Sequence, residues 1–321
     1  MIRLRAYKQQ IAHSHPGVRG NHISHFSLLT SHFLRACMVI IFLTSHFSFL
    51  ISLAQPVSYT PADSTRIVSL LDEASHQPRT TNFPLFFARK FIGKPYVAHT
   101  LEVLDGEERL IVNTRQLDCT TLVENVTALT LCAYRSLYTF RDYLNALMSL
   151  RYRQGRLDGY PSRLHYFTDW IVDNTRMQLV DELQQPVPPF TDLQTVHVNY
   201  MSTHPQAYKA LRQHPAFVDV IRQQEDSLTG LTFRFIPKSA LKTPTQAMCQ
   251  AIQEGDIIAI TCSKPGLDIA HLGFAVWRQD GLHLLNASQI RKKVVEEPMT
   301  MYDYMQRHPS FTGIRVIRIR K

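Results

Sequence analysis

Residues 115–131, RQLDCTTLVENVTALTL, place one cysteine directly after an aspartate and in front of a run of apolar residues. Apolar side chains recur from Leu122 to Ala133 at spacings of three and four, which predicts a helix whose first turn contains Cys119. A thiolate at that position is stabilised by free amide groups and by the helix dipole, whereas most buried cysteines are inert packing residues. Cys119 is therefore either a nucleophile or a core residue of this helix.

Around this stretch, helical periodicity dominates the earlier part of the chain. A helix is predicted over 61–74, and mainly helical structure over 140–181 and 206–228. Five strands are predicted near the C-terminus, at 255–262, 270–278, 282–288, 292–298 and 313–320. Helices followed by antiparallel strands indicate an α+β fold. We expect a single domain over 55–321, with a mainly helical insertion at 140–235.

The charge of the chain is concentrated at its N-terminus. The formal net charge is +9, from 35 Lys and Arg against 26 Asp and Glu. Five of the basic residues and none of the acidic ones lie within the first 54 residues, which leaves 30 against 26 and a net charge of +4 for the remainder. No basic stripe interleaved with aromatic residues lies outside this leader, so the sequence argues against nucleic-acid binding.

The leader has the features of an export signal. Residues 36–55, ACMVIIFLTSHFSFLISLAQ, follow the basic region with an apolar run that ends in Ser52, Leu53 and Ala54. A small-x-small ending is the pattern that a signal peptidase accepts, so cleavage is predicted after Ala54. A membrane anchor is the alternative, although polar residues interrupt the run and argue against a stable span. We therefore expect a periplasmic or extracellular protein.

Four cysteines follow the leader, namely Cys119, Cys132, Cys249 and Cys262. Two disulfides would be allowed in an exported domain, but the cysteine density is far below that of a disulfide-stapled scaffold. No pair has the spacing of a zinc site, so we expect no metal and no cofactor. Cys132 is about three and a half helical turns beyond Cys119, and we expect packing roles for Cys132, Cys249 and Cys262.

A cysteine nucleophile needs a general base, which usually comes from a distant part of the sequence. His271 follows the loop SKPGLDIA at the start of a predicted strand, and we expect its ring at an edge of the sheet. Asn286 lies on the next predicted strand, where its amide oxygen could accept the imidazole proton. Each residue also has a noncatalytic alternative. His271 could be an exposed histidine at the end of a strand, and Asn286 could be an asparagine that terminates a turn.

Five short motifs occur in one order along the chain: GKPY at 93–96, DCTTLV at 118–123, GDII at 255–258, HLGF at 271–274 and LNA at 285–287. Together they resemble the motifs of the NlpC-type papain-like cell-wall cysteine hydrolases. FIGKPYVAHTLE, LDCTTLVENV, YPSRLHYFTDW and GLDIAHLGF are similar, more particularly, to the N-acetylmuramoyl-L-alanine amidase-like branch of that superfamily. The resemblance extends over about residues 80–321.

The resemblance implies a papain-like core, in which the cysteine helix packs on an antiparallel sheet that carries the histidine. It implies catalysis by Cys119, His271 and Asn286 through a thioester, although many members of the superfamily carry histidine at the position of Asn286. It further implies a set of substrate-binding residues: Tyr96, Asp118, Ser162, Arg163 and His165. The alternatives are that Tyr96 packs under the cysteine helix and that Arg163 holds the inserted helices together.

The function implied is that of an exported cysteine amidase that hydrolyses the amide bond between N-acetylmuramic acid and L-alanine. The substrate would be peptidoglycan or its soluble muropeptide fragments. One alternative is a stem-peptide endopeptidase that cuts the γ-D-glutamyl bond, since it would share all the catalytic residues. Another is a noncatalytic muropeptide-binding protein that keeps the fold without turnover.

Overall fold

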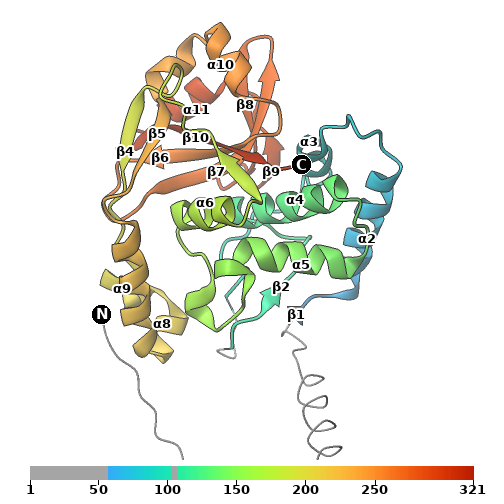
Figure 1. Ribbon diagram of the computed structural model, residues 1–321, viewed down its shortest axis with the longest axis vertical. Coiled ribbons are helices and arrows are strands. Elements are labelled where there is room, and N and C mark those ends of the chain that lie inside the picture. The colour runs from blue at the N-terminus through green and yellow to red at the C-terminus, as the bar shows by residue number, and fades with distance from the viewer. Residues whose placement is uncertain (1–56, 103–106) are drawn as a thin grey trace, which may run out of the picture. The chain divides into compact units, whose positions relative to one another are not determined.

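The computed structural model describes residues 57–102 and 107–321 of the chain. The export signal predicted over 1–54, with its cleavage after Ala54, lies outside these residues. Most helices of the described chain come before residue 229 and most strands come after residue 231 (Figure 1). This order confirms the predicted α+β class. Residues Gln55–Lys321 form one compact unit.

The helices agree with the two strongest periodic signals in the sequence. The helix predicted over 61–74 is observed as α2, and the helix predicted from Cys119 is observed as α4. The α-helices of the described chain are α2 (Pro61–Ser75), α3 (Phe83–Arg89), α4 (Cys119–Tyr134), α5 (Phe140–Arg151), α6 (Phe167–Arg176), α7 (Tyr200–Thr203), α8 (Lys209–Gln213), α9 (Ala216–Leu228), α10 (Gln246–Ala251) and α11 (Met301–Gln306). Within the described residues, none of the helices has the length and apolarity needed to cross a membrane.

The strands form one eight-stranded antiparallel sheet and one short parallel pair. The order in the sheet is β4-β5-β10-β6-β7-β8-β9, with β3 also paired to β10, and β1 pairs with β2. All five predicted strands are confirmed, as β6 to β10. The bounds are β1 (Val57–Ser58), β2 (Leu110–Ile111), β3 (Val180–Glu182), β4 (Asp192–Thr195), β5 (Thr232–Pro237), β6 (Ile257–Cys262), β7 (Ile269–Arg278), β8 (Gly281–Ser288), β9 (Lys293–Glu296) and β10 (Phe311–Ile319).

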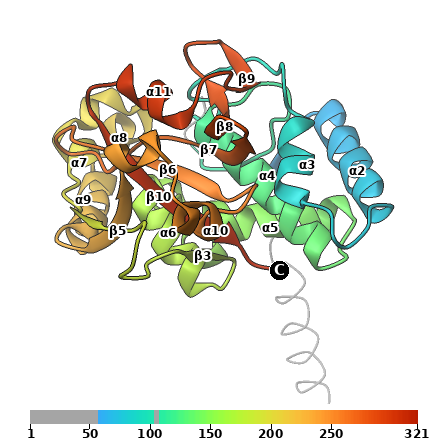
Figure 2. The ribbon, with the colours of Figure 1, turned by 90° about the horizontal axis from the view of Figure 1, so that it is seen from above.

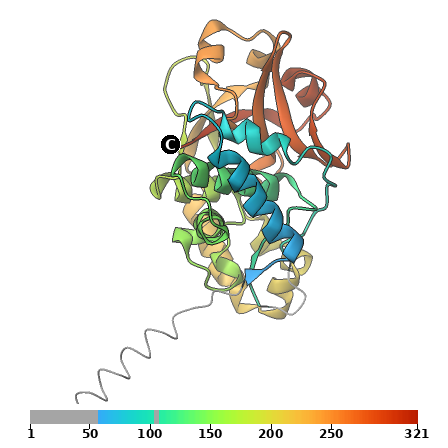
Figure 3. The ribbon, with the colours of Figure 1, turned by 90° about the vertical axis from the view of Figure 1, so that its right-hand side faces the viewer.

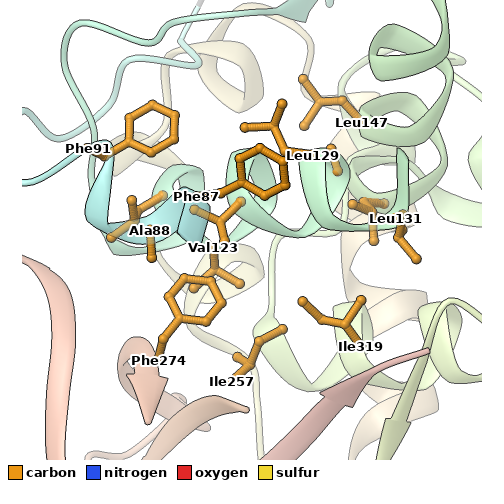
Figure 4. Packing of buried hydrophobic residues seen from close by; sticks show 14 of the residues in the cluster. Phe87, Ala88, Phe91, Val123, Leu129, Leu131, Leu147, Ile257, Phe274 and Ile319 are labelled. Carbon is orange, nitrogen blue, oxygen red and sulfur yellow. The ribbon is translucent and has the colours of Figure 1, made fainter. Parts of the chain in front are cut away.

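Helix α4 is the centre of the packing. It lies between the sheet and the helices α2, α3 and α5 (Figures 2 and 3). Every residue from Thr121 to Ala133 is buried. Figure 4 shows Phe87 of α3 on one side of α4 and Phe274, Ile257 and Ile319 of the sheet on the other. Burial on all sides explains why the periodicity of this stretch is only weakly amphipathic, with threonines at several buried positions.

The region 140–235, predicted to be a mainly helical insertion, contains strands as well as helices. Strands β3 and β4 lie within it and β5 begins in it, while Trp170 of α6 packs in the same core cluster as Leu129 of α4. A separate cluster around Tyr166, Met201 and other residues joins α7, α8 and α9. The region therefore extends both the sheet and the main core.

A buried ion pair ties α4 to α5. The Arg151 guanidinium donates to the Glu124 carboxylate at 2.7 Å, and both side chains are 2% exposed. Arg151 also donates to the carbonyl oxygen of Ile111 in β2 at 2.6 Å. Removal of one partner from such a pair leaves a buried charge without compensation, which costs much more than the loss of an exposed pair.

We predict that Glu124→Gln lowers the free energy of unfolding by about 3 to 5 kcal/mol, because Arg151 keeps its charge and loses its counterion. Urea denaturation followed by circular dichroism measures the change. Asp219→Asn is the matched control, since Asp219 pairs with Arg222 on the surface and its loss should cost less than about 1 kcal/mol. Equal losses in the two variants would contradict the role given to the buried pair.

Candidate active site

The start of α4 is fixed by the side chain before the cysteine. Asp118 is the N-cap residue, and its Oδ1 accepts hydrogen bonds from the Thr121 amide and the Thr121 hydroxyl, both at 2.8 Å. The Thr121 hydroxyl in turn accepts from the Asp118 amide at 2.9 Å, which completes a capping box. Cys119 is therefore the first residue of the helix. Asp118, predicted to bind substrate, is engaged in this cap.

His271 and Asn286 are brought together by the antiparallel pairing of β7 and β8. His271 Nε2 donates to Asn286 Oδ1 at 3.0 Å, and Asn286 Nδ2 donates to the Leu284 carbonyl oxygen at 3.4 Å. This arrangement leaves Nδ1 as the basic nitrogen of His271. The expectation of a ring at a sheet edge was wrong, because β7 lies between β6 and β8 and the His271 side chain is buried.

One cavity of about 190 Å³ has both Cys119 and His271 in its wall. We call it the Cys119 cavity. Its walls come from the tip of α4, the start of β7, the loop before β7, and the segments around α6, α7 and α8. The lining residues are Cys119, Thr120, His165, Tyr166, Phe167, Met201, Tyr208, Leu267, Asp268, Ile269, Ala270, His271 and Leu272.

Two larger hollows, of about 380 and 500 Å³, lie around Tyr134 and Lys321 and contain no cysteine. The arginines of the first are already paired, Arg318 with Asp256 and Arg320 with Asp181. Because neither hollow combines a nucleophile with a base, the Cys119 cavity is the better candidate for chemistry.

Burial controls the protonation of the two central groups. Burial and the neighbouring Asp118 carboxylate raise the pKa of the Cys119 thiol to about 12, although contacts with the backbone of Leu272 and Thr120 oppose the rise. Burial also lowers the pKa of His271 below its ordinary range, while the hydrogen bond with Asn286 opposes that change. With a neutral imidazole, Cys119 is therefore a thiol, and the helix tip alone does not hold it as a thiolate.

Tyr96 lies beside the residues that precede the nucleophile. The Val97 amide donates to the Leu117 carbonyl oxygen at 3.1 Å. The segment around Tyr96 therefore runs beside Leu117, two residues before Cys119. Burial, together with the charges of Cys119 and Asp118, raises the pKa of Tyr96 to about 12. Tyr96 packs against the main core cluster and is not part of the cavity wall.

The three predicted residues of the segment YPSRLHYFTDW have different environments. His165 lines the Cys119 cavity and donates from Nε2 to the Tyr160 carbonyl oxygen at 3.0 Å. The Ser162 hydroxyl donates to the Gly159 carbonyl oxygen at 2.7 Å, within a turn. Neither Ser162 nor Arg163 lines the cavity.

Arg163 is held by groups of the protein itself. Its guanidinium donates to Glu102 at 2.9 Å and to the Leu101 carbonyl oxygen at 3.0 Å, and lies over the Tyr160 ring at 4.9 Å. Glu108 is 3.6 Å away, and the Arg163 side chain is 7% exposed. These contacts tie Arg163 to residues 101–108, which precede the predicted insertion, and do not join the inserted helices to one another.

Several cavity residues were not selected from the sequence. Asp268 stands three positions before His271 within the quoted segment GLDIAHLGF, so its proximity to a candidate base was the available signal. Tyr208 and Met201 come from the helical region, where nothing in the periodicity indicates a cavity wall. The Tyr166 hydroxyl donates to the buried Glu225 at 2.6 Å, which fixes that wall.

The four described cysteines are free thiols. Cys132 is buried within α4, as predicted, and Cys262 is buried in β6. Cys249 is exposed on α10, so the packing role predicted for it was wrong. Its six-residue helix presents this position to solvent, which a lone cysteine in the sequence could not reveal.

Comparison with known proteins supports the family resemblance that the motifs indicate. Residues 86–314 match the N-acetylmuramoyl-L-alanine amidase-like family, also described as AmiA-like. The chain belongs to this family. A search of curated proteins gives no match.

Solved structures extend this relationship. The structure of an N-acetylmuramoyl-L-alanine amidase from Bacteroides uniformis is 38% identical with a TM-score of 0.69, over 78% of this chain and 100% of that one. A protein from Bacteroides fragilis, provisionally named a xylanase, is 39% identical with a TM-score of 0.67, over 73% of this chain and all of that one. A Legionella pneumophila protein is 19% identical with a TM-score of 0.63, over 80% and 94% of the two chains, and shares the fold.

We predict that His165 makes the protein less stable in acid. Burial and the nearby Arg163 lower the pKa of His165 to about 3, whereas an unfolded histidine titrates near its ordinary value of about 6.5. Between these values the unfolded state binds the additional proton, so the free energy of unfolding falls as the pH falls.

In His165→Gln, which keeps a donor for the Tyr160 carbonyl, the loss of unfolding free energy between pH 7 and pH 4.5 should be smaller by about 1 to 2 kcal/mol. Urea denaturation at the two pH values measures this difference. His76→Gln, at an exposed histidine, is the control and should follow the wild type. An unchanged pH dependence in His165→Gln would refute the assignment.

Proposed function

We propose that this chain is an exported cysteine amidase with a papain-like core, which hydrolyses the amide bond between N-acetylmuramic acid and L-alanine. The observation that carries the proposal is the placement of Cys119 and His271 in the wall of one cavity, with His271 Nε2 bound to Asn286. Membership of the amidase-like family supports the substrate class. The substrate is peptidoglycan or a soluble fragment of it.

In the proposed reaction His271 acts first as the base. Its Nδ1 takes the proton of the Cys119 thiol as the sulfur attacks the lactyl carbonyl carbon and forms a carbon–sulfur bond. The imidazolium then returns the proton to the nitrogen of L-alanine as the carbon–nitrogen bond breaks, which releases the peptide. Water, deprotonated by the same imidazole, hydrolyses the thioester to the lactyl carboxylate and the free thiol.

The tip of α4 offers a donor for the negative charge that develops on the carbonyl oxygen. The Thr121 amide is occupied by Asp118 and the Thr120 backbone contacts the Cys119 sulfur, so the Cys119 amide is the helix-tip donor left for this oxygen. The Tyr96 hydroxyl, on the segment beside Leu117, is a further candidate. Preorganised donors at this point stabilise the transition state more than the substrate.

The name of the Bacteroides fragilis relative raises the alternative of glycoside hydrolysis. That chemistry uses two carboxyl groups on either side of the scissile bond. The Cys119 cavity has a single carboxylate in its wall, that of Asp268, and one of its oxygens accepts from the Thr168 amide at 2.7 Å. The cavity therefore favours a cysteine reaction at an amide bond.

We predict that incubation with a defined disaccharide tetrapeptide releases the intact tetrapeptide, as judged by the masses of the products. Cys119→Ala should abolish the release, because no other side chain of the cavity can form the thioester. A product that retains the sugar with a dipeptide would instead establish the γ-D-glutamyl endopeptidase. Binding of the substrate without any product would establish the noncatalytic alternative.

We predict that Asn286 positions the base and adjusts its protonation. Burial keeps His271 neutral below its ordinary pKa of about 6.5, so the acid limb of kcat/KM should lie below that pH. Asn286→Ala should lower kcat by about 10- to 100-fold and move the acid limb to still lower pH, because the hydrogen bond that favours the imidazolium is lost.

Asn286→Asp is the matched variant, since a carboxylate favours the imidazolium and should move the acid limb to higher pH. Profiles of kcat/KM against pH for the three proteins measure these shifts. If Asn286 had only a structural role, both variants would lose activity, and the acid limbs of their kcat/KM profiles would not move in opposite directions. That outcome would remove Asn286 from the proposed mechanism.

A further inference from the structure

The wall of the Cys119 cavity contains few charged side chains. None of its lining residues is a lysine or an arginine, and Asp268 is the one acidic residue among them. His165 is uncharged at neutral pH, because burial lowers its pKa to about 3. The rest of the wall is mostly apolar or aromatic, as with Phe167, Met201 and Leu272. The side chains of this cavity thus provide one negative charge in an otherwise neutral surface.

Asp268 is buried, and only one of its two carboxylate oxygens accepts a hydrogen bond from the described residues. The residue is 3% exposed, and its Oδ2 accepts from the amide of Thr168 in the first turn of α6. Its carbonyl oxygen accepts from Gln194 Nε2 at 2.9 Å and from the Cys262 amide at 3.3 Å. The second carboxylate oxygen, Oδ1, accepts no hydrogen bond from the described residues.

A buried arginine that is linked to Asp268 through Thr168 is paired with another carboxylate. Arg315 is fully buried and donates to the Thr168 hydroxyl at 2.7 Å, but its charge is paired with Glu182 at 2.5 Å. Asp268 forms no ion pair with any described residue. A buried carboxylate without a counterion is costly, and this one is part of the wall beside the candidate nucleophile.

We propose that Asp268 is the specificity residue of a subsite for an ammonium group of the substrate, with Oδ1 as its acceptor. The proposal rests on the function proposed above and adds the chemistry of the group that enters the cavity. The cavity excludes a carboxylate of the stem peptide, because it would meet Asp268 without a cationic partner. Besides the neutral amide that Cys119 attacks, an ammonium group is the part of the substrate that would compensate Asp268.

Two amines of a stem peptide have this chemistry. One is the side-chain amine of the diamino acid at the third position, which is present while the peptide is still attached to the sugar. The other is the α-amine of L-alanine, which is free only when the sugar has been removed. The first source fits the amidase, whereas the second fits an endopeptidase that acts on released peptides.

The test measures binding by calorimetry to the full chain carrying Cys119→Ala, so that turnover does not interfere. The probes are N-acetylmuramoyl-L-Ala-γ-D-Glu-L-Lys, its counterpart with norleucine in place of lysine, the free tripeptide L-Ala-γ-D-Glu-L-Lys and its α-N-acetyl form. Loss of the amine that occupies the subsite should weaken binding by about 10- to 100-fold, the range of a charge-assisted hydrogen bond. Comparison of the lysine probe with the norleucine probe tests the side-chain amine. Comparison of the free tripeptide with its α-N-acetyl form tests the α-amine.

Adding Asp268→Asn should weaken binding of the amine-bearing probe by the same factor and leave its amine-lacking partner unchanged, since asparagine still accepts from Thr168. Asp173→Asn is the control, because Asp173 is also buried and accepts one amide hydrogen bond, from Gln154 at 2.8 Å, away from the cavity. This control should bind every probe as the parent does.

Equal affinity for amine-bearing and amine-lacking probes would overturn the subsite. So would an Asp268→Asn variant that loses affinity for all probes alike, because Asp268 would then serve only to hold α6. Binding is independent of turnover in this design. Amine-dependent binding by a wild-type chain that hydrolyses nothing would therefore refute the amidase and keep the subsite.

Discussion

The capping of α4 by Asp118 is the constraint on which the site depends. A carboxylate that occupies the Thr121 amide fixes the first helical residue at Cys119. Burial of α4 between three helices and the sheet then fixes the direction in which that residue points. Burial and the same carboxylate raise the pKa of the thiol, so the features that place the nucleophile also keep it protonated until a base removes the proton.

The register between β7 and β8 places His271 beside Asn286. Phe274 pairs with Leu285, so Gly273 and Asn286 stand opposite each other one position further along. A Cβ on Gly273 would lie 2.6 Å from the Leu285 carbonyl oxygen and 2.7 Å from the Leu284 side chain, so the strands approach closely because this residue has no side chain. Asn286 can then extend past Gly273 to His271.

Much of this arrangement was predictable because it rests on patterns that repeat. Helix α4 and strands β6 to β10 have apolar residues at regular intervals, and the order of short motifs related Cys119 to His271 across the fold. Strand β4 was missed, since its sequence DLQT has no apolar alternation and its position depends on pairing with β5. The burial of His271 was missed for a similar reason, because it depends on the strands on either side of β7.

Arg163 and Asp268 illustrate why residue type alone does not identify a ligand contact. Arg163 was predicted to bind substrate, yet Glu102, the Leu101 carbonyl and the Tyr160 ring engage its guanidinium inside the protein. Asp268 was not selected, and among the described residues only one of its two carboxylate oxygens has a donor at the wall of the cavity. A buried charge that the fold has already compensated stabilises the fold, whereas a buried charge left uncompensated beside a nucleophile gains its partner only when a ligand arrives. This difference depends on which groups the fold assembles around each charge.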